Sequence, residues 1–515
     1  MQNFLARHQS EVKGVLSGWD RIRFRGTNRH ISHWAGMMQL LSLLSVLLKD
    51  FSVWAQSLTD QLRCATEKLA KDASRPIRYL YSSQIRKEDL VREIAEKDGI
   101  TEGLIVVLSC VEPCYTWHVR KDRDAQKLKL EQFSGKCLHY YFYYQHPQFG
   151  LMHVRLQSWL PFTVNICING REWLAQDLTR IKMPFEKRDN CFVDLADVPR
   201  AQQIFDMQLQ TDWISTLSSM LDMVHPTHSQ LFGRWTVPYY WSTDESEWAT
   251  DVMFRSPDVL AKYYPPFVRY GITTFGPGDV MRFFGRRPLV KMLTTGTVES
   301  HLGTRAEGVR IKHQLEGNSV KMYDKQGSVL RVETTINNPA VITVQRGTEK
   351  EPLKVQPRKM RKGVADMARR ANASQSVNER YLDSMAAVTQ EEPLQQTIAP
   401  LCQPTELNGR RVRALSPLSQ NDGKLLATIG QSEFILHGFR NQDLRTILFQ
   451  DDSTRTAKQK SGKVTRLFRL LRAHGLIRKV PKSHRYQVTA QGRLQITAIL
   501  AAQHANTKEL VQMAA

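Results

Sequence analysis

The sequence predicts an α+β fold with several domains: a mixed α/β N-terminal block, a central antiparallel β-sheet with helices, and a C-terminal unit of helices with one β-hairpin. Three observations predict it. The chain has 515 residues, more than one domain usually holds. Strand and helix patterns alternate up to about residue 200, and three short strands separated by turn residues follow within 307–336. Helical periodicity then dominates about the last fifth of the chain.

Changes of composition along the chain suggest the domain boundaries. Residues 391–421 are rich in Pro, Gln, Ser and Asn, which is typical of a linker. We expect an α/β domain of unknown role at 1–200, an α+β domain with a basic β-meander at 201–340, a basic helical and linker segment at 341–405, and a C-terminal domain at 406–515.

The N-terminal block begins with helices interrupted by a short basic strand at 21–25, where apolar and charged residues alternate. The apolar stretch 34–48 is shorter than the ~20 residues that a bilayer requires, and it predicts a buried helix. Mixed elements follow: strands at 77–81, 104–110, 137–144, 151–156 and 163–168, and helices at 87–97 and from residue 170.

The composition limits the classes of function. Hydrophobic residues make up 41% of the chain, so it is neither disordered nor collagenous. Lys and Arg number 72 against 50 Asp and Glu, a net charge of +22 that favours a polyanionic partner, nucleic acid first. The sequence contains no GxxxxGK[ST] loop and no GxSxG elbow, which argues against ATP-driven work and against an α/β-hydrolase.

The cysteines and the N-terminus favour a cytoplasmic protein without a membrane partner. Seven scattered cysteines include no CxxC pair, and Cys110 and Cys114 are the nearest two, so reduced thiols are expected. The first residues carry Glu11 and no apolar run, unlike a secretory signal. Homo-oligomers are compatible with all of these features.

The central part ends in a predicted three-stranded meander at 308–315, 320–325 and 329–336, with turn residues between the strands. Period-two alternation puts a basic and aromatic set on one polar surface, where cations can follow phosphates while a ring stacks on a base. An exposed sheet face with cross-strand ion pairs is an equal alternative. The set is Arg310, Lys312, Lys321, Tyr323, Lys325, Arg331 and Glu333.

Within this meander, VKMYDKQGSVLRVETTI resembles the strand pair of rolling-circle replication initiators of plasmids and filamentous phages. That family carries Tyr-x-Lys followed by Arg-x-Glu, which Tyr323, Lys325, Arg331 and Glu333 match. The resemblance implies a DNA strand nicked by a tyrosine with the help of Mg²⁺ or Mn²⁺. Tyr323, or Tyr381 on a following helix, would be the nucleophile. The chain departs from many such enzymes because it lacks their His-hydrophobic-His metal motif.

Carboxylates gather in residues 242–251, which we expect to follow a strand. Oxygen ligands suit Mg²⁺ and Mn²⁺, so Asp251 together with Glu333 forms the candidate metal site, to which Asp279 or Asp324 could contribute. The alternative is a solvated acidic loop.

The C-terminal part shows helical patterns at 424–430, after Asn441, and at 463–474, then a hairpin and a last helix. Its segment RLLRAHGLIRKVPKSHRYQVTAQGR resembles the recognition helix and wing of bacterial winged helix-turn-helix DNA-binding proteins. From residue 406 onward there are 19 Lys and Arg against seven Asp and Glu. The cations expected to bind duplex DNA are Lys463, Arg466, Arg469, Arg472, Arg478, Lys479, Lys482 and Arg485. The alternative is a solvated basic face on a protein-binding winged helix.

Two functions therefore remain open. The first is a strand-nicking initiator of a replicon or mobile element, and the second is a non-catalytic DNA-binding regulator or nucleoprotein scaffold. RNA is a further candidate ligand, because the charge pattern does not distinguish the two nucleic acids.

Overall fold

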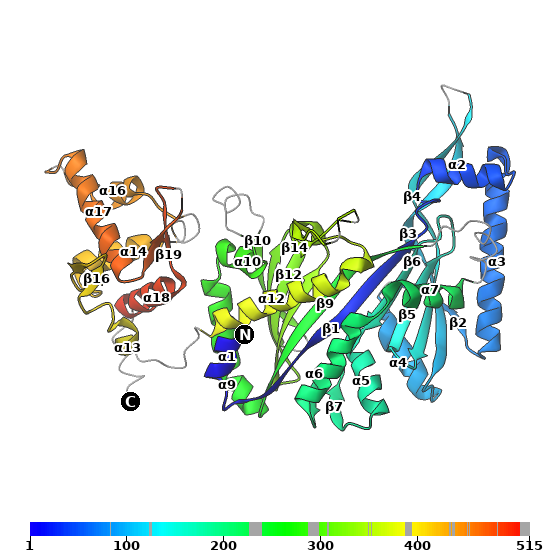
Figure 1. The fold of residues 1–515 in the computed structure, drawn as a ribbon, viewed down its shortest axis with the longest axis horizontal. Coiled ribbons are helices and arrows are strands. Elements are labelled where there is room, and N and C mark those ends of the chain that lie inside the picture. Colours follow the sequence, from blue (N-terminus) through cyan, green and yellow to red (C-terminus); the bar gives the residue numbers. More distant parts are fainter. Residues whose placement is uncertain are drawn as a thin grey trace.

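The protein consists of one large β-sheet covered by helices and a C-terminal helical unit beside it (Figure 1). The computed structural model describes residues 1–82, 84–122, 126–225, 239–286, 298–305, 308–348, 350–351, 353–386, 394–431, 434, 438–450, 452, 454–481 and 483–504.

The large sheet has eleven strands in the order β10-β11-β12-β13-β9-β1-β6-β5-β4-β3-β2. Their bounds are β1 Val12–Thr27, β2 Ile77–Tyr79, β3 Gly103–Lys121, β4 Leu128–His146, β5 Gly150–Gln157, β6 Val164–Asn169, β9 Tyr240–Phe254, β10 Val298–Arg305, β11 Gly308–Leu315, β12 Asn318–Lys325 and β13 Val329–Ile336.

The strands of the expected central sheet pair antiparallel, but they belong to one larger sheet that continues into the N-terminal block and is not purely antiparallel. β2 pairs with β3 in parallel, because the chain returns through helix α4 (Lys87–Lys97) before it enters β3. A parallel pair needs such a crossover, whereas the other neighbouring strands pair antiparallel. The fold is thus mixed α/β with a large mixed sheet.

Strand β1 lies in the middle of the sheet, paired with β6 on one side and β9 on the other. The sheet therefore runs across residue 200, where the sequence suggested a domain boundary. Helix α6 (Val198–Met207) packs closely on β1, and a Cβ at Gly18 would collide with the ring of Phe205. Glycine at this position allows the close approach.

Helices cover the sheet, and α12 crosses the strands of its central part (Figure 1). Asn378 on α12 donates to the Trp248 carbonyl on β9 and accepts from Thr334 on β13. The helices outside the C-terminal unit are α1 Gln2–Arg7, α2 Trp34–Leu43, α3 Phe51–Asp72, α5 Gly170–Arg180, α7 Trp213–Val224, α9 Pro257–Thr274, α10 Pro277–Phe283 and α12 Met367–Met385. This part of the chain also contains the short 3-10 helices η1 Leu48–Asp50, η2 Gln208–Gln210, η3 Pro339–Val341 and η4 Val364–Asp366. Two small hairpins pair β7 Phe185–Arg188 with β8 Cys191–Leu195 and β14 Thr343–Arg346 with β15 Gln356–Lys359.

The apolar stretch 34–48 does not form one buried helix. α2 ends at Leu43, and Ser45 takes a left-handed backbone conformation with φ 52°. Met37 and Leu40 are buried, whereas Trp34 and Leu47 are more than half exposed. Among the described residues no single helix has the length and apolar character to cross a bilayer, although α2 and the η1–α3 segment, bent by 96°, would meet that criterion together.

The C-terminal unit has its own hydrophobic core, to which Leu426, Phe439, Leu444, Phe468 and Ile496 contribute. Its elements are α13 Leu394–Ile398, β16 Thr405–Leu407, β17 Arg410–Val412, α14 Gln420–Ile429, α16 Asn441–Leu448, α17 Ala457–Ala473, β18 Ile477–Lys479, β19 Tyr486–Val488 and α18 Ala490–His504. The hairpin β16–β17 lies in the stretch expected to be a linker. An ion pair of 2.6 Å between Arg493 and Asp279 connects this unit to α10.

Candidate active site

A polar cavity of about 300 Å³ lies on one face of the large sheet. Strand register explains its lining: Tyr323 on β12 pairs with Arg310 on β11 and Arg331 on β13, and Lys321 pairs with Glu333. Alternate residues on these strands, such as Met322 and Val332, enter the hydrophobic core on the other face. The predicted polar set thus shares a face, but that face is largely buried. Residues that line the cavity include Asp20, Arg21, Tyr143, Glu247, Arg310, Lys321, Tyr323, Lys325, Arg331 and Glu333.

Three carboxylates from different strands meet in this cavity. Asp20 on β1, Glu247 on β9 and Glu333 on β13 each place one oxygen within 4.8 Å of the other two. All three side chains are buried, with exposed fractions of 4%, 9% and 3%. A register shift between Trp19 and Ile22 interrupts the β1–β9 pairing next to Asp20. Like charges this close require protons or cations between them.

Lys321 neutralises part of the acidic charge. Its Nζ lies 2.5 Å from Glu333 Oε1 and 3.2 Å from Glu247 Oε1. Burial and the neighbouring Glu333 carboxylate raise the pKa of Glu247 to about 7. Burial opposes ionisation of Glu333 as well, but Lys321 and a hydrogen bond from Tyr323 outweigh it and lower the pKa of Glu333. Near neutral pH, Glu333 is therefore the ionised partner and Glu247 is the partner that holds a proton part of the time.

Tyr323 donates a hydrogen bond of 2.6 Å from its phenol oxygen to Glu333 Oε2. Burial and the Glu333 charge raise the pKa of Tyr323 well above its ordinary value, so the side chain is a neutral phenol. The neighbouring lysines do not offset this: Lys321 binds the two glutamates, and Lys325 lies 3.2 Å from Asp189. A carboxylate in contact with the phenol is placed to accept its proton.

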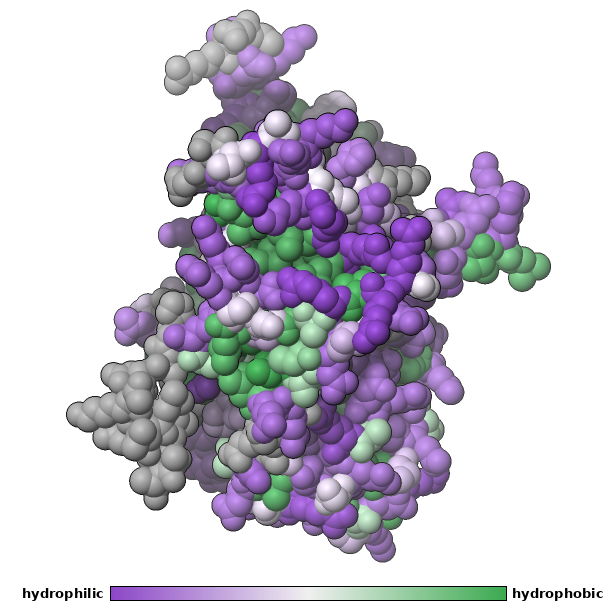
Figure 2. Space-filling view, turned by 90° about the vertical axis from the view of Figure 1, so that its left-hand side faces the viewer, coloured by the Kyte–Doolittle hydropathy of each residue, from purple (hydrophilic) through white to green (hydrophobic). Residues whose placement is uncertain are grey.

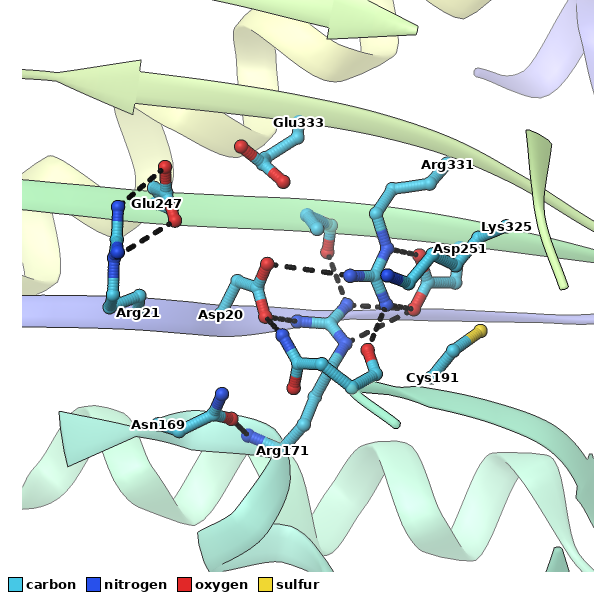
Figure 3. Close-up of polar contacts among 12 residues, drawn as sticks. Asp20, Arg21, Asn169, Arg171, Cys191, Glu247, Asp251, Lys325, Arg331 and Glu333 are labelled. Carbon is cyan, nitrogen blue, oxygen red and sulfur yellow. Dashed lines mark hydrogen bonds and ion pairs between the residues drawn. The ribbon is translucent and has the colours of Figure 1, made fainter. Parts of the chain in front are cut away.

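Beside the three carboxylates, two buried arginines hold Asp251 (Figure 3). Arg331 Nε lies 2.6 Å from Asp251 Oδ1, and Arg171 Nη2 lies 2.8 Å from Asp251 Oδ2. Arg331 also reaches Asp20 at 3.4 Å. Both oxygens of Asp251 are thus occupied by arginines, and the structure does not place this residue among the three clustered carboxylates. Arg331 is 1% exposed and fixes Asp20 and Asp251 instead of facing solvent.

The remaining predicted residues of this region lie apart. Tyr381 is fully buried on α12, with its ring against Phe275 and Phe283, and is not part of the cavity lining. Arg310 lines the cavity and forms no ion pair with any residue that the structure describes. Lys312 is half-buried on β11 outside the cavity lining.

Residues of this region that the sequence did not single out include Asp20, Arg171 and Tyr143. Asp20 directly precedes the basic strand pattern, and Arg171 is the second residue of α5, whose N-cap is Asn169. Glu247 was part of the acidic run but was placed in a loop, whereas it lies in the middle of β9. Only the pairing of β1 with β6 and β9 brings these residues together, and the sequence contains no local signal of that pairing.

A second basic region lies on the C-terminal unit. Lys463, Arg466 and Arg472 on α17 are exposed, as are Arg478 and Lys479 on β18. Arg469 is half-buried, and Arg485 is half-buried with Nη1 donating to the Gly438 carbonyl at 3.3 Å. Lys482 lies outside the described residues. Figure 2 views this end of the molecule and shows a largely hydrophilic face around a band of hydrophobic residues.

Comparisons with protein-family models, with curated proteins and with solved structures found no significant match to the chain.

Proposed function

We propose that this protein nicks a DNA strand through Tyr323, as the initiator of a replicon or mobile element. The observation that carries the proposal is the 2.6 Å hydrogen bond from the Tyr323 phenol to Glu333, within a cavity that holds two further carboxylates. The resemblance of the Tyr-x-Lys and Arg-x-Glu strands to rolling-circle initiators supports the same assignment. Both the nucleophile and its proton acceptor come from those two strands.

The chemistry follows from this contact. The Tyr323 oxygen forms a bond to phosphorus, the bond from phosphorus to one deoxyribose oxygen breaks, and the leaving oxygen takes a proton from water. The phenolic proton passes to Glu333, because a phenol with a raised pKa does not ionise in advance. Arg310 faces the same cavity and contacts the phosphate. The product is a phosphotyrosine that keeps one strand end attached to the protein.

A divalent cation fits the three clustered carboxylates. Asp20, Glu247 and Glu333 offer the hard oxygen ligands that Mg²⁺ and Mn²⁺ prefer. Burial and the Glu333 charge raise the pKa of Glu247, and a divalent cation bound beside it would favour its ionised form. When bound, such an ion would neutralise charge on the scissile phosphate. These ligands replace the histidines that the family motif would supply.

The test compares two tyrosine variants on supercoiled and single-stranded origin DNA with Mg²⁺ or Mn²⁺. We expect wild type to give nicked product and a covalent protein–DNA adduct, and Tyr323→Phe to give neither. Tyr381→Phe is the control, because Tyr381 is buried in the core and outside the cavity lining. An adduct formed by Tyr323→Phe, or no nicking by wild type on either substrate, would refute the proposal.

We propose in addition that the C-terminal unit is a winged helix that binds duplex DNA. Helices α14, α16 and α17 precede the β18–β19 hairpin and α18, and Phe439 pairs with Tyr486 as a further strand position beside that hairpin. Helix α17 and strand β18 expose six cations to solvent, which suits phosphate contacts on both sides of a groove. This unit would bring the cavity to its site on DNA.

A non-catalytic DNA-binding regulator is the second candidate. The observation that favours it is the buried state of Tyr323, which is only 9% exposed, together with the exposed cations of α17. It predicts binding to duplex DNA that is independent of Mg²⁺ and leaves every strand intact, so the adduct assay separates the two functions.

A further inference from the structure

Two cysteines and a histidine meet on strands β3 and β4, away from the acidic cavity. Cys114 Sγ lies 3.3 Å from Cys137 Sγ, and His139 Nδ1 lies 4.0 Å from Cys137 Sγ. One ligand atom of each of the three residues lies within 4.8 Å of the others. Cys114 pairs with Gly135 and Cys137 with Glu112, so the two cysteines are diagonal neighbours. Both are free thiols.

The spacing of these atoms matches a tetrahedral site for a soft metal ion. Zn–S bonds of about 2.3 Å and Zn–N bonds of about 2.0–2.1 Å place two sulfurs about 3.8 Å apart, and a sulfur and a nitrogen about 3.6 Å apart. The observed separations of 3.3 and 4.0 Å lie on either side of these values. Small side-chain adjustments would bring the three atoms around one ion.

His139 is suited to serve as a neutral ligand. Its side chain is fully buried, and burial favours the uncharged imidazole that binds a metal ion. The nitrogen that faces Cys137 Sγ is Nδ1, which also lies 3.1 Å from the Cys137 carbonyl. To bind the ion, Nδ1 would leave this carbonyl, and the neutral ring would carry its proton on Nε2, which has no hydrogen-bond partner among the described residues.

The position of the cluster suggests what the metal does. β5 pairs with β4 only from His139 onward, so Val111–Lys121 of β3 and the facing part of β4 pair with each other alone. This two-stranded arm projects beyond the rest of the sheet (Figure 1). Near its base the arm also contacts other segments, because Trp117 donates from its backbone N to the Leu160 carbonyl and from Nε1 to the Ile31 carbonyl. Without a third strand, however, the arm has less support than the rest of the sheet. The cluster lies where the arm leaves the sheet, at the point where a link between its strands is most useful.

We propose that Cys114, Cys137 and His139 bind a thiophilic divalent cation, Zn²⁺, that fastens the base of the β3–β4 arm. Two thiolates and one imidazole supply three ligands, and water supplies the fourth. Each thiol loses its proton to solvent on binding, so the affinity rises with pH. The site is separate from the three carboxylates, whose oxygens select harder cations.

The experiment uses the full-length protein, purified under reducing conditions, and measures metal content and Co²⁺ spectra. We expect one zinc per chain, lost in Cys114→Ser and in Cys137→Ser. Cys110→Ser is the matched control, because Cys110 lies on the same strand but binds Glu112 at 3.2 Å outside the cluster. Wild type with Co²⁺ in place of zinc should show the intense sulfur-to-cobalt absorption of thiolate ligands. This measurement tests the site without any substitution.

Glu333→Gln should keep this absorption unchanged, which separates the cluster from the acidic cavity. Three results would overturn the proposal: wild type that shows no thiolate absorption with Co²⁺, zinc that persists in the Cys114→Ser/Cys137→Ser double variant, or a Cys114–Cys137 disulfide in zinc-free protein under the same reducing conditions.

Discussion

The acidic cavity and the C-terminal unit both gather basic side chains, but they place them in opposite environments. Arg171 and Arg331 are almost fully buried and are held by Asp20 and Asp251, whereas Arg466 and Arg472 on α17 face solvent. A buried cation is committed to its protein partner, and an exposed one remains available to a phosphate. Positive charge in this chain therefore serves internal organisation in one region and remains exposed to solvent in the other.

The largest expected effect comes from removing a buried counter-ion. Asp251→Ala leaves Arg171 and Arg331 without their main partner in the interior, and breaking such a pair costs about 3–5 kcal/mol of unfolding free energy. Asp60→Ala is the control, because its partner Arg63 lies on the exposed surface of α3 and such pairs contribute about 0–1 kcal/mol. Urea unfolding of both variants measures the difference. A loss below 1 kcal/mol for Asp251→Ala would show that the arginine pair is not a structural centre.

Removing the proton acceptor should affect catalysis more than binding. In Glu333→Gln the amide cannot take the Tyr323 proton, so we expect nicking to fall by about 10²–10⁴-fold, while duplex affinity is unchanged. The control is Glu299→Gln on β10, whose carboxylate is exposed and binds His301 at 3.2 Å. Rates of strand nicking and filter binding provide the two measurements. Equal nicking by Glu333→Gln and wild type would remove Glu333 from the mechanism.

The polar face of the meander was predictable, and the complete site was not. Period-two alternation correctly gave strands 308–315 and 329–336 and placed Tyr323 with Arg331 and Glu333. Strand β9 was hidden because Asp244, Glu245 and Glu247 resemble a solvated loop, although β9 pairs on both sides with other strands. Its charges are satisfied by arginines and lysine from distant segments, such as Arg21, and no local pattern reveals such partners.

The two tyrosines show the same limit on a smaller scale. Tyr323 was a candidate because it matches the Tyr-x-Lys element of the initiators, and Tyr381 because it lies on the helix that follows the meander. Tyr381 follows Val377 at helical spacing, and both enter the core on α12, so that spacing was the signal for burial. Tyr323 lies on the face of β12 opposite to its buried neighbours Val320 and Met322. The two tyrosines therefore differ in where their rings point: Tyr381 into the core beneath α12, and Tyr323 into the cavity. The direction of the Tyr381 ring depends on how α12 packs against the sheet.

The pH dependence of the unfolding free energy should reveal the proton that Glu247 holds in the folded protein. Its pKa is raised from 4.5 to about 7 by burial and Glu333, so the folded protein holds a proton that the unfolded chain releases. The contribution of Glu247 is therefore largest at low pH and is lost as pH rises from about 4.5 to about 7. Buried histidines titrate in an overlapping range, so the measurement is the difference in unfolding free energy between wild type and Glu247→Gln. That difference should fall across this range, and addition of Mg²⁺ should reduce the fall. A flat difference would contradict the assigned proton.

The smallest effect is expected for an exposed cation of the C-terminal unit. Arg466→Ala on α17 removes a solvent-facing cation, so its unfolding free energy should remain within about 0.5 kcal/mol of wild type. If Arg466 contacts a phosphate, duplex affinity falls modestly and the slope of log affinity against log salt decreases by about 1. Lys424→Ala is the matched control, because Lys424 is equally exposed but lies on α14 instead of α17 or the hairpin. Equal slopes for the two variants would mean that the position of a charge on the C-terminal unit does not matter for binding. The proposal that α17 forms the DNA-contacting surface would then be wrong.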